Sequence, residues 1–403
     1  MPPWYRNQIA LISVAFVGFA SYTLVMPFLA LYVRELGVTR DADVALWTGL
    51  ALGATPAITA LCSPFWGRVG DRYGDKILVQ RSLLSFVLVM VAMAYVRHPW
   101  HLVALRALQG VVAGYGGLTL AMAARSAPRD QMAHAIGLVQ TAQRMGPGVG
   151  PIIGGILAPL AGLRGTFFIS AAVYAVSFLL LTVLYVEPPR ATAGHRARDG
   201  RVTFGNILAF ENFVLLMAVI FMLQLVDRSF GPILPLHLER IGYGARVELI
   251  AGLLFSALAV SGALGHQLAA TLLRRLSARR VIATAALTAA TGLTVVAVSE
   301  SLWTLAPAMA LIGLSLGTAL TAAFSAAGAV IPPEAHSASF GFLTSASLIG
   351  SAISPVLSGL MVGRSFRVVF ITGAVLLGGL ALAVRRVMVQ RDLHIEHTPV
   401  AED

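Results

Sequence analysis

Charge is scarce in this chain: only 12% of its 403 residues are Asp, Glu, Lys or Arg, whereas 57% are hydrophobic. A soluble protein of this length needs far more charged side chains to cover its surface. This excludes an ordinary soluble fold and predicts a polytopic membrane protein. Cysteine is almost missing too. Cys62 stands alone, so no internal disulfide can form, and we interpret it as an inert residue of a span.

The residue patterns of catalytic sites are also missing. The sequence has no metal-ligand cluster, no nucleophile–base arrangement and no phosphate-binding loop. We therefore expect no enzyme, no metal and no other cofactor. A membrane-embedded enzyme or sensor is the competing class, and reconstituted protein that turned over a covalent bond would support it.

Long apolar runs are abundant. Twelve segments near the ~20 residues that a bilayer requires fall at 8–33, 44–66, 77–96, 100–124, 133–161, 165–186, 208–237, 247–270, 281–299, 302–327, 337–361 and 368–384. The first has no cleavage site behind it, so we expect it to be retained. Most of the 29 Lys and Arg residues lie in one class of alternating segments, which includes both termini. The positive-inside rule places that class in the cytoplasm, so the net charge of +11 reflects topology and predicts no nucleic-acid partner.

The chain repeats itself. PFLALYVRELG at 27–37 aligns with PILPLHLERIG at 232–242, and glycines and prolines of the fifth and eleventh spans recur at nearly the same offset. A duplicated six-helix unit is typical of secondary transporters, which bind substrate near the midplane between the halves. We predict an all-α multi-pass protein with an N-terminal half at 1–186, a cytoplasmic linker at 187–206, a C-terminal half at 207–388 and a cytoplasmic tail at 389–403.

The fifth span contains the stretch RMGPGVGPIIGG, residues 144–155. Gly146, Gly150 and Gly154 are spaced by four residues, so they share one helix face and allow a second membrane helix to approach closely. We expect that helix to be the eighth span, which offers Gly252, Ser256 and Gly265. Plain tight packing without a transport role is the alternative interpretation.

The same stretch resembles a known motif. It is similar to the fifth-helix antiporter motif GxxxGPxxGG of the major facilitator superfamily, which it matches at Gly146, Gly150, Pro151, Gly154 and Gly155. The resemblance implies a twelve-helix fold and, more narrowly, a drug:proton antiporter of the multidrug or tetracycline type.

The loop GRVGDRYGDK, residues 67–76, resembles the signature loop of that superfamily. Its matching residues include Gly67, Asp71, Arg72 and Gly74. The resemblance implies that Asp71 latches onto the start of the eleventh span in one transporter state. A solvated turn with positive-inside charges is the alternative, and Asp75 departs from the family because a basic residue is usual there.

The stretch RALQG, residues 106–110, resembles the fourth-helix motif. A charged group inside a span is costly and functional by default. The resemblance implies that Arg106 lies near the first helix and takes part in proton coupling, with Gln109 in its network. A structural role, in which Arg106 bonds backbone carbonyls, is the alternative.

Arg144 belongs to no motif and lies deep in the fifth span. It points away from the glycine face, so we expect it, with Gln140 one turn earlier, to line the central cavity. A structural salt bridge is the alternative. The predicted cavity set comprises Arg144, Gln140, Gln224, Arg228, Tyr22 and Gln109.

Asp227 is the only one of the 18 Asp and Glu residues that we place deep in a span. A buried carboxyl group can bind and release a proton near physiological pH. Adjacent helical side chains diverge, so we expect no pairing with Arg228. We predict that Asp227 exchanges a proton for Arg106 or Arg144 as the halves rock. A permanent Asp227–Arg salt bridge that only holds helices together is the alternative.

Other polar residues suggest structural roles. We expect Glu35, Glu239 and Glu300 to face water at span ends, and His266 to be a packed polar residue. The first span has no acidic residue in its middle, which favours a neutral, zwitterionic or anionic amphiphile over a cation.

These patterns together predict a monomeric exporter of lipophilic small molecules. We expect it to lie in the inner or plasma membrane with both termini cytoplasmic, to exchange protons for substrate, and to contact membrane lipids. A facilitator, or a transporter of a lipid-like or anionic metabolite, is the alternative.

Overall fold

The computed structural model describes residues 3–128, 131–187, 212–331 and 336–389, and its regular elements there are all helical. The first group contains α1 (Pro3–Leu24), η1 (Met26–Phe28), α2 (Leu29–Glu35), α3 (Asp41–Tyr73), α4 (Asp75–Ala94), α5 (Pro99–Val112), α6 (Tyr115–Ser126) and α7 (Met132–Leu184). The second contains α9 (Phe213–Asp227), α10 (Phe230–Leu238), η2 (Glu239–Tyr243), η3 (Gly244–Arg246), α11 (Val247–Leu273), α12 (Ala278–Val298), α13 (Leu302–Val330), α14 (His336–Val362) and α15 (Phe366–Val387). The predicted linker and tail lie largely outside the described residues.

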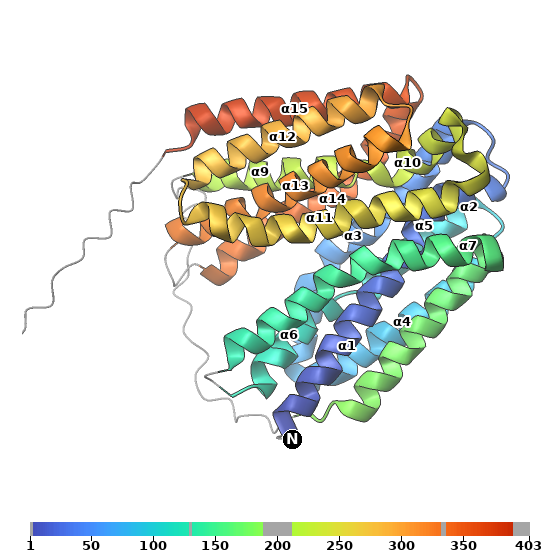
Figure 1. Ribbon diagram of the computed structural model, residues 1–403. Helices are drawn as coiled ribbons and strands as arrows, with labels where there is room; N and C mark the ends of the chain where they lie inside the picture. The colour runs from blue at the N-terminus through green and yellow to red at the C-terminus, as the bar shows by residue number, and fades with distance from the viewer. Residues whose placement is uncertain (1–2, 129–130, 188–211, 332–335, 390–403) are drawn as a thin grey trace, which may run out of the picture.

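Eleven helical segments of the described chain are long and apolar enough to cross a bilayer. One of them, His134–Leu184, has 51 residues, whereas a single crossing takes about 20. Its backbone breaks at Gly162, where φ is +72°, and the chain reverses there (Figure 1). This segment therefore supplies two spans, and the all-α multi-pass fold predicted from the sequence is confirmed.

Three other spans of the described chain are interrupted: the first, the fourth, and the seventh, which breaks between α9 and α10. The first breaks between α1 and α2 around Pro27, which has no N–H to continue the helix. The fourth breaks between α5 and α6 at Gly114, whose φ of +128° only glycine adopts readily. The break at Gly114 directly precedes Tyr115, one of the buried polar residues described below.

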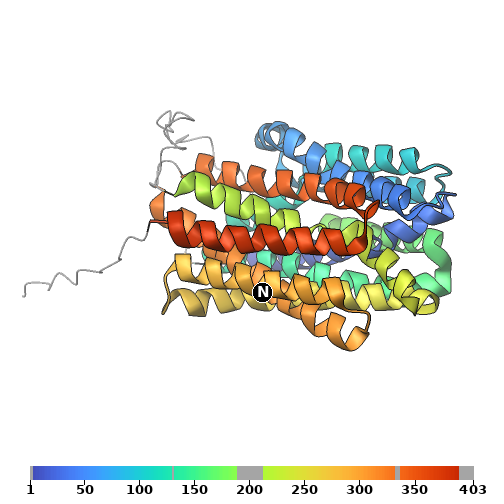
Figure 2. The same ribbon diagram turned by 90° about the horizontal axis from the view of Figure 1, so that it is seen from above.

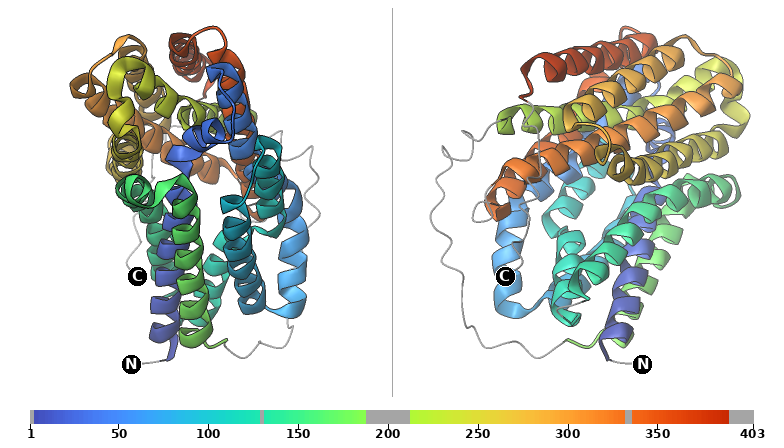
Figure 3. Two further views of the ribbon diagram at one scale, coloured as in Figure 1. Left: turned by 90° about the vertical axis from the view of Figure 1, so that its right-hand side faces the viewer. Right: turned by 60° about the vertical axis from the view of Figure 1, so that its left-hand side comes forward.

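The helices form two bundles, α1–α7 and α9–α15, that meet at one end and diverge at the other (Figures 1 and 3). Seen from above, the long helices lie side by side along one common axis (Figure 2). The bundles meet where α3 packs against α14 and α7 against α11. They diverge toward the end at which α1 begins and α15 ends.

Candidate transport site between the two bundles

The glycine face of α7 packs against α1 and not against α11. A Cβ built on Gly150 or Gly154 would lie within 3.0 Å of α1 or η1 atoms, including the Ala20 and Leu24 carbonyl oxygens. Gly146 meets Phe16 and Ala20 in the same way. The predicted pairing of this face with the eighth span is therefore wrong, because the spacing indicates a close approach without naming the helix that approaches.

A second face of α7 meets α11, in the other bundle. A Cβ on Gly252 would lie within 3.0 Å of the Pro151 carbonyl oxygen, and one on Gly155 would lie 2.9 Å from the Glu248 carbonyl oxygen. Gly265, another residue of the predicted partner set, instead packs against Leu314 of α13. Pro151 and Gly155 of the motif thus lie at the seam between the bundles.

The opposite seam repeats this contact through the equivalent residues of the sequence repeat. A Cβ on Gly49 of α3 would lie within 3.0 Å of the Pro355 carbonyl oxygen of α14. Gly49 corresponds to Gly252 and Pro355 to Pro151 in the two halves. Two matching glycine–proline contacts therefore hold the bundles together at one end.

An ion-pair cluster lies at the same end. Arg34 of α2 pairs with Glu239 of η2 in the other bundle, and its second terminal nitrogen lies 2.5 Å from Asp41. The Glu239 side chain is only 25% exposed. The expectation that Glu239 faces water is wrong, because the closed seam brings a cation against it.

Arg106 is fully buried in α5, within the first bundle. One terminal nitrogen donates to the Gln109 side-chain oxygen at 3.1 Å, and the guanidinium lies 5.8 Å from the centre of the Tyr22 ring on α1. Its Nε and other terminal nitrogen have no hydrogen-bond partner among the described residues. Neither do the hydroxyl groups of Tyr115 and Tyr174, which are buried in the same bundle.

This cluster is rich in donors and lacks an anion. Arg106 forms no ion pair and donates to no backbone carbonyl in the described chain, so the alternative of a carbonyl-bonded arginine finds no contact. A buried cation without a counter-charge is costly. The two tyrosines were missed by the sequence reasoning because nothing in their spacing marks them as neighbours of Arg106.

Arg144 and Gln140 are exposed on α7, and neither forms a hydrogen bond or ion pair with a described residue. The structural salt bridge considered for Arg144 therefore has no described partner. Gln143 beside them donates instead to the Gly116 carbonyl oxygen at 2.8 Å, in α6.

Asp227 ends α9, and its carboxylate lies 3.3 Å from Nε of Arg228. The expectation that these side chains diverge is wrong, because the rule for adjacent helical residues fails at the last turn of a helix. The pair is half-open to its surroundings, with side-chain exposures of 27% and 50%. Three residues earlier, Gln224 donates to the Ser347 hydroxyl of α14 at 2.8 Å.

The signature loop is only partly described. The side chains of Asp71 and Arg72, and the surroundings of Gly67, lie outside the described residues, so the predicted latch stays a prediction. Gly74 has a φ of +99° and precedes α4. Asp75, which departs from the family pattern, is buried and pairs with Arg125 at the end of α6.

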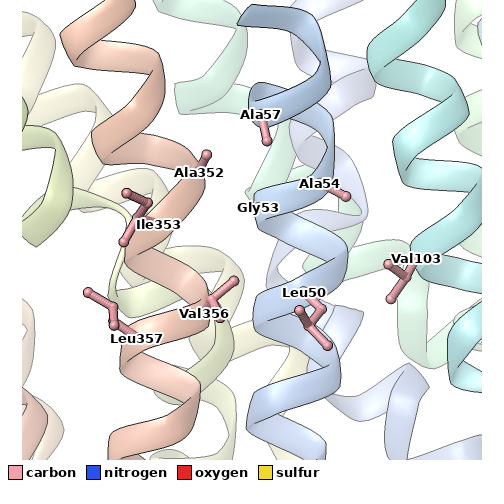
Figure 4. A pocket seen from close by; sticks show the side chains of 9 residues that line it. All are labelled: Leu50, Gly53, Ala54, Ala57, Val103, Ala352, Ile353, Val356 and Leu357. Atoms are coloured by element: carbon pink, nitrogen blue, oxygen red, sulfur yellow. The ribbon is translucent and has the colours of Figure 1, made fainter. Parts of the chain in front are cut away.

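An apolar pocket of about 370 Å³ lies on the seam between α3 and α14 (Figure 4). α3 and α14 line it from opposite sides, and Val103 of α5 adds a third wall. All its lining residues are Gly, Ala, Val, Leu or Ile. No group of three metal-ligating side chains occurs among the residues that the structure describes.

Sequence comparison agrees with this architecture. The profile of the Major Facilitator Superfamily matches residues 11–280 and 216–402. The chain belongs to this superfamily. It is therefore a multi-pass membrane transporter of a small molecule and not an enzyme, as the motifs predicted.

Several relatives carry the same name. The chain is 32% identical to "Multidrug resistance protein MdtG" of Dickeya zeae, over 92% of this chain and 91% of the relative. It is 31% identical to the protein of that name from Citrobacter koseri, over 79% of each chain.

Solved structures show the same fold. A bacterial homologue of the human lysosomal transporter Spinster, in an inward-facing and unoccupied conformation, superposes with a TM-score of 0.81 at 17% identity, covering 96% of this chain and 98% of that one. The nucleoside transporter NupG (D323A mutant) superposes with a TM-score of 0.70 at 16% identity, covering 95% and 100%.

Proposed function

We propose that this protein is a proton-coupled exporter of lipophilic small molecules that works by alternating access in the inner or plasma membrane. The observation that carries the proposal is the seam: matching glycine–proline contacts join the bundles at one end, and the bundles diverge at the other. A transporter whose halves meet at one end only presents its central site to one side of the membrane.

The charge distribution supports a cytoplasmic opening. The helix ends at the open end carry Lys76, Arg125, Arg274, Arg279 and Arg385. The closed end mixes cations with carboxylates that pair with them, as Arg34 does with Glu239. The positive-inside rule then makes the open end cytoplasmic, with both termini on that side. The conformation is the one that takes up substrate from the cytoplasm.

The polar residues provide a route for coupling. In this conformation Asp227 pairs with Arg228, whereas Arg106 and Arg144 have no counter-ion among the described residues. Protonation of Asp227 would break its ion pair with Arg228. When Asp227 is ionised again in the other conformation, it can pair with a different cation. This exchange of ion pairs links proton binding to conformation. It also gives the Asp227–Arg228 pair a role other than holding helices together.

The relatives named for multidrug resistance support export of drug-like molecules. A facilitator without coupling is the second candidate, favoured by the half-open position of Asp227. We expect a monomer surrounded by lipid, with protons and the small molecule as its ligands.

The test of coupling is transport in proteoliposomes. The full-length protein should accumulate naphthoate, a lipophilic anion, in the compartment on its extracellular side when that compartment is acidic, against the passive distribution of a weak acid. A protonophore should abolish the accumulation. Equal flux with and without the pH gradient would support the facilitator.

A further inference from the structure

One face of α7 runs along the seam with α11 from the closed end toward the opening. Pro151 and Gly155 form its tight contacts, and a Cβ on Gly148 would lie 3.0 Å from Cγ2 of Val260. Arg144 precedes Gly148 by four residues, so it lies on the same face one turn nearer the opening. It is exposed there.

The stretch of α11 that faces α7 runs antiparallel to it, from the closed end toward the opening. Gly252 lies against Pro151, and Val260 against Gly148. The next titratable residue toward the opening is His266, which is half-buried. Its Nδ1 lies 2.6 Å from the Thr321 hydroxyl of α13. Arg144 lies four residues from the Gly148–Val260 contact and His266 six, so at about 1.5 Å per residue both stand roughly 6–9 Å nearer the opening, and the guanidinium charge acts on the imidazole.

The two residues thus flank the point at which the bundles separate, each on a different bundle. The described groups that act on the imidazole are Arg144 from α7, the Thr321 hydroxyl and the Gly317 carbonyl from α13, and no carboxylate is among them. Neither basic residue forms an ion pair in the described chain. Two basic groups without a counter-ion repel each other when both are charged, and an anion placed between them would turn that repulsion into attraction.

We propose that Arg144 and His266 bind the anionic group of the transported molecule from opposite bundles. This inference rests on the proposed export function and names its substrate class: a lipophilic body carrying a small anionic head such as a carboxylate or phosphonate. Arginine suits this role because its planar fork can donate two parallel hydrogen bonds to such a group. The imidazole supplies a single donor on the other side, held in orientation by Thr321. Bound anion would draw α7 and α11 together at the opening and so favour closure of that end.

The test compares three probes of matched shape: naphthoate, naphthamide and naphthyltrimethylammonium. Binding is measured by equilibrium dialysis with the purified full-length protein in nanodiscs. Arg144→Gln should weaken naphthoate binding about tenfold or more, the usual loss when a charge-assisted hydrogen bond is removed. Binding of naphthamide should change by less than about twofold, because the amide has no charge to lose.

The variants separate charge from shape. Arg144→Lys keeps the charge without the fork and should recover part of the naphthoate affinity. His266→Gln should weaken naphthoate binding several-fold. Arg280→Gln is the matched control, since it removes a cation at the exposed start of α12 and should bind all three probes as the unmodified protein does. Equal thermal stability of the variants shows that they are folded.

Two results would overturn the inference: unchanged naphthoate binding in both Arg144→Gln and His266→Gln, or tightest binding of the ammonium probe by the unmodified protein. If the proposed export function were wrong and the binding site right, the result would differ. Naphthoate binding would still depend on Arg144, but a pH gradient would move no probe.

Discussion

Replacing Gly252 with alanine should shift the protein away from its inward-open conformation. The added Cβ would lie within 3.0 Å of the Pro151 carbonyl oxygen, whereas ordinary contact begins at 3.4 Å. Both groups belong to helices, so the seam must open instead of a side chain turning aside. Overpacking of this kind costs about 1–3 kcal/mol. The cost falls only on the conformation in which this seam is closed, so the ratio of the two states should change by about 5–150-fold.

The shift can be measured as a distance between spin labels. Cysteines at Arg40 and Arg246 report on the closed end from the two bundles, in a Cys62→Ala background, since both positions are exposed. Gly252→Ala should populate a longer distance that the unmodified protein shows weakly. Gly378→Ala is the matched control, because a Cβ there meets no atom within 4 Å. Identical distance distributions for Gly252→Ala and the control would refute the role assigned to the seam.

Two more substitutions test other contacts. Gly150→Leu should force α7 away from α1, because even a Cβ at this position is too close to the Ala20 carbonyl oxygen. Efflux should fall sharply while membrane insertion persists. Normal gradient-driven efflux would show that the glycine face has no role in transport. Arg34→Glu should open the closed end by placing like charges against Glu239 and Asp41, and adding Glu239→Arg should restore one pair. Failure of the double variant to recover the spin-label distance of the unmodified protein would contradict a contribution of the Arg34–Glu239 pair to closing that end.

Sequence reasoning reached the fold because its signals are local. Apolar length marks the spans, and the recurrence of Pro151 and Gly155 as Pro355 and Gly359 marks the duplicated halves. The spacing of Gly146, Gly150 and Gly154 did not identify the helix that they contact. A spacing of four residues predicts a helix face that tolerates close approach, but whether α1 or α11 lies against it depends on how all the helices are arranged.

The candidate site was harder to predict for the same reason. Arg106 and Arg144 stand out because charges inside spans are rare, and both could be selected from the sequence. The pairing of Arg34 with Glu239 joins residues that are far apart in the chain, so it exists only through the relative position of the bundles. Asp227 pairs with Arg228 because α9 ends there, and this break lies inside the predicted span 208–237, where apolar length does not mark it.

The most direct test of proton-coupled export is the behaviour of Asp227→Asn, which removes the titratable group and keeps its shape. Two fluxes are measured in the same proteoliposomes: exchange of probe at equal concentrations without a pH gradient, and uphill accumulation driven by a gradient. If Asp227 carries the proton, the variant should still exchange the probe but lose uphill accumulation. Uphill accumulation at the rate of the unmodified protein would contradict the account.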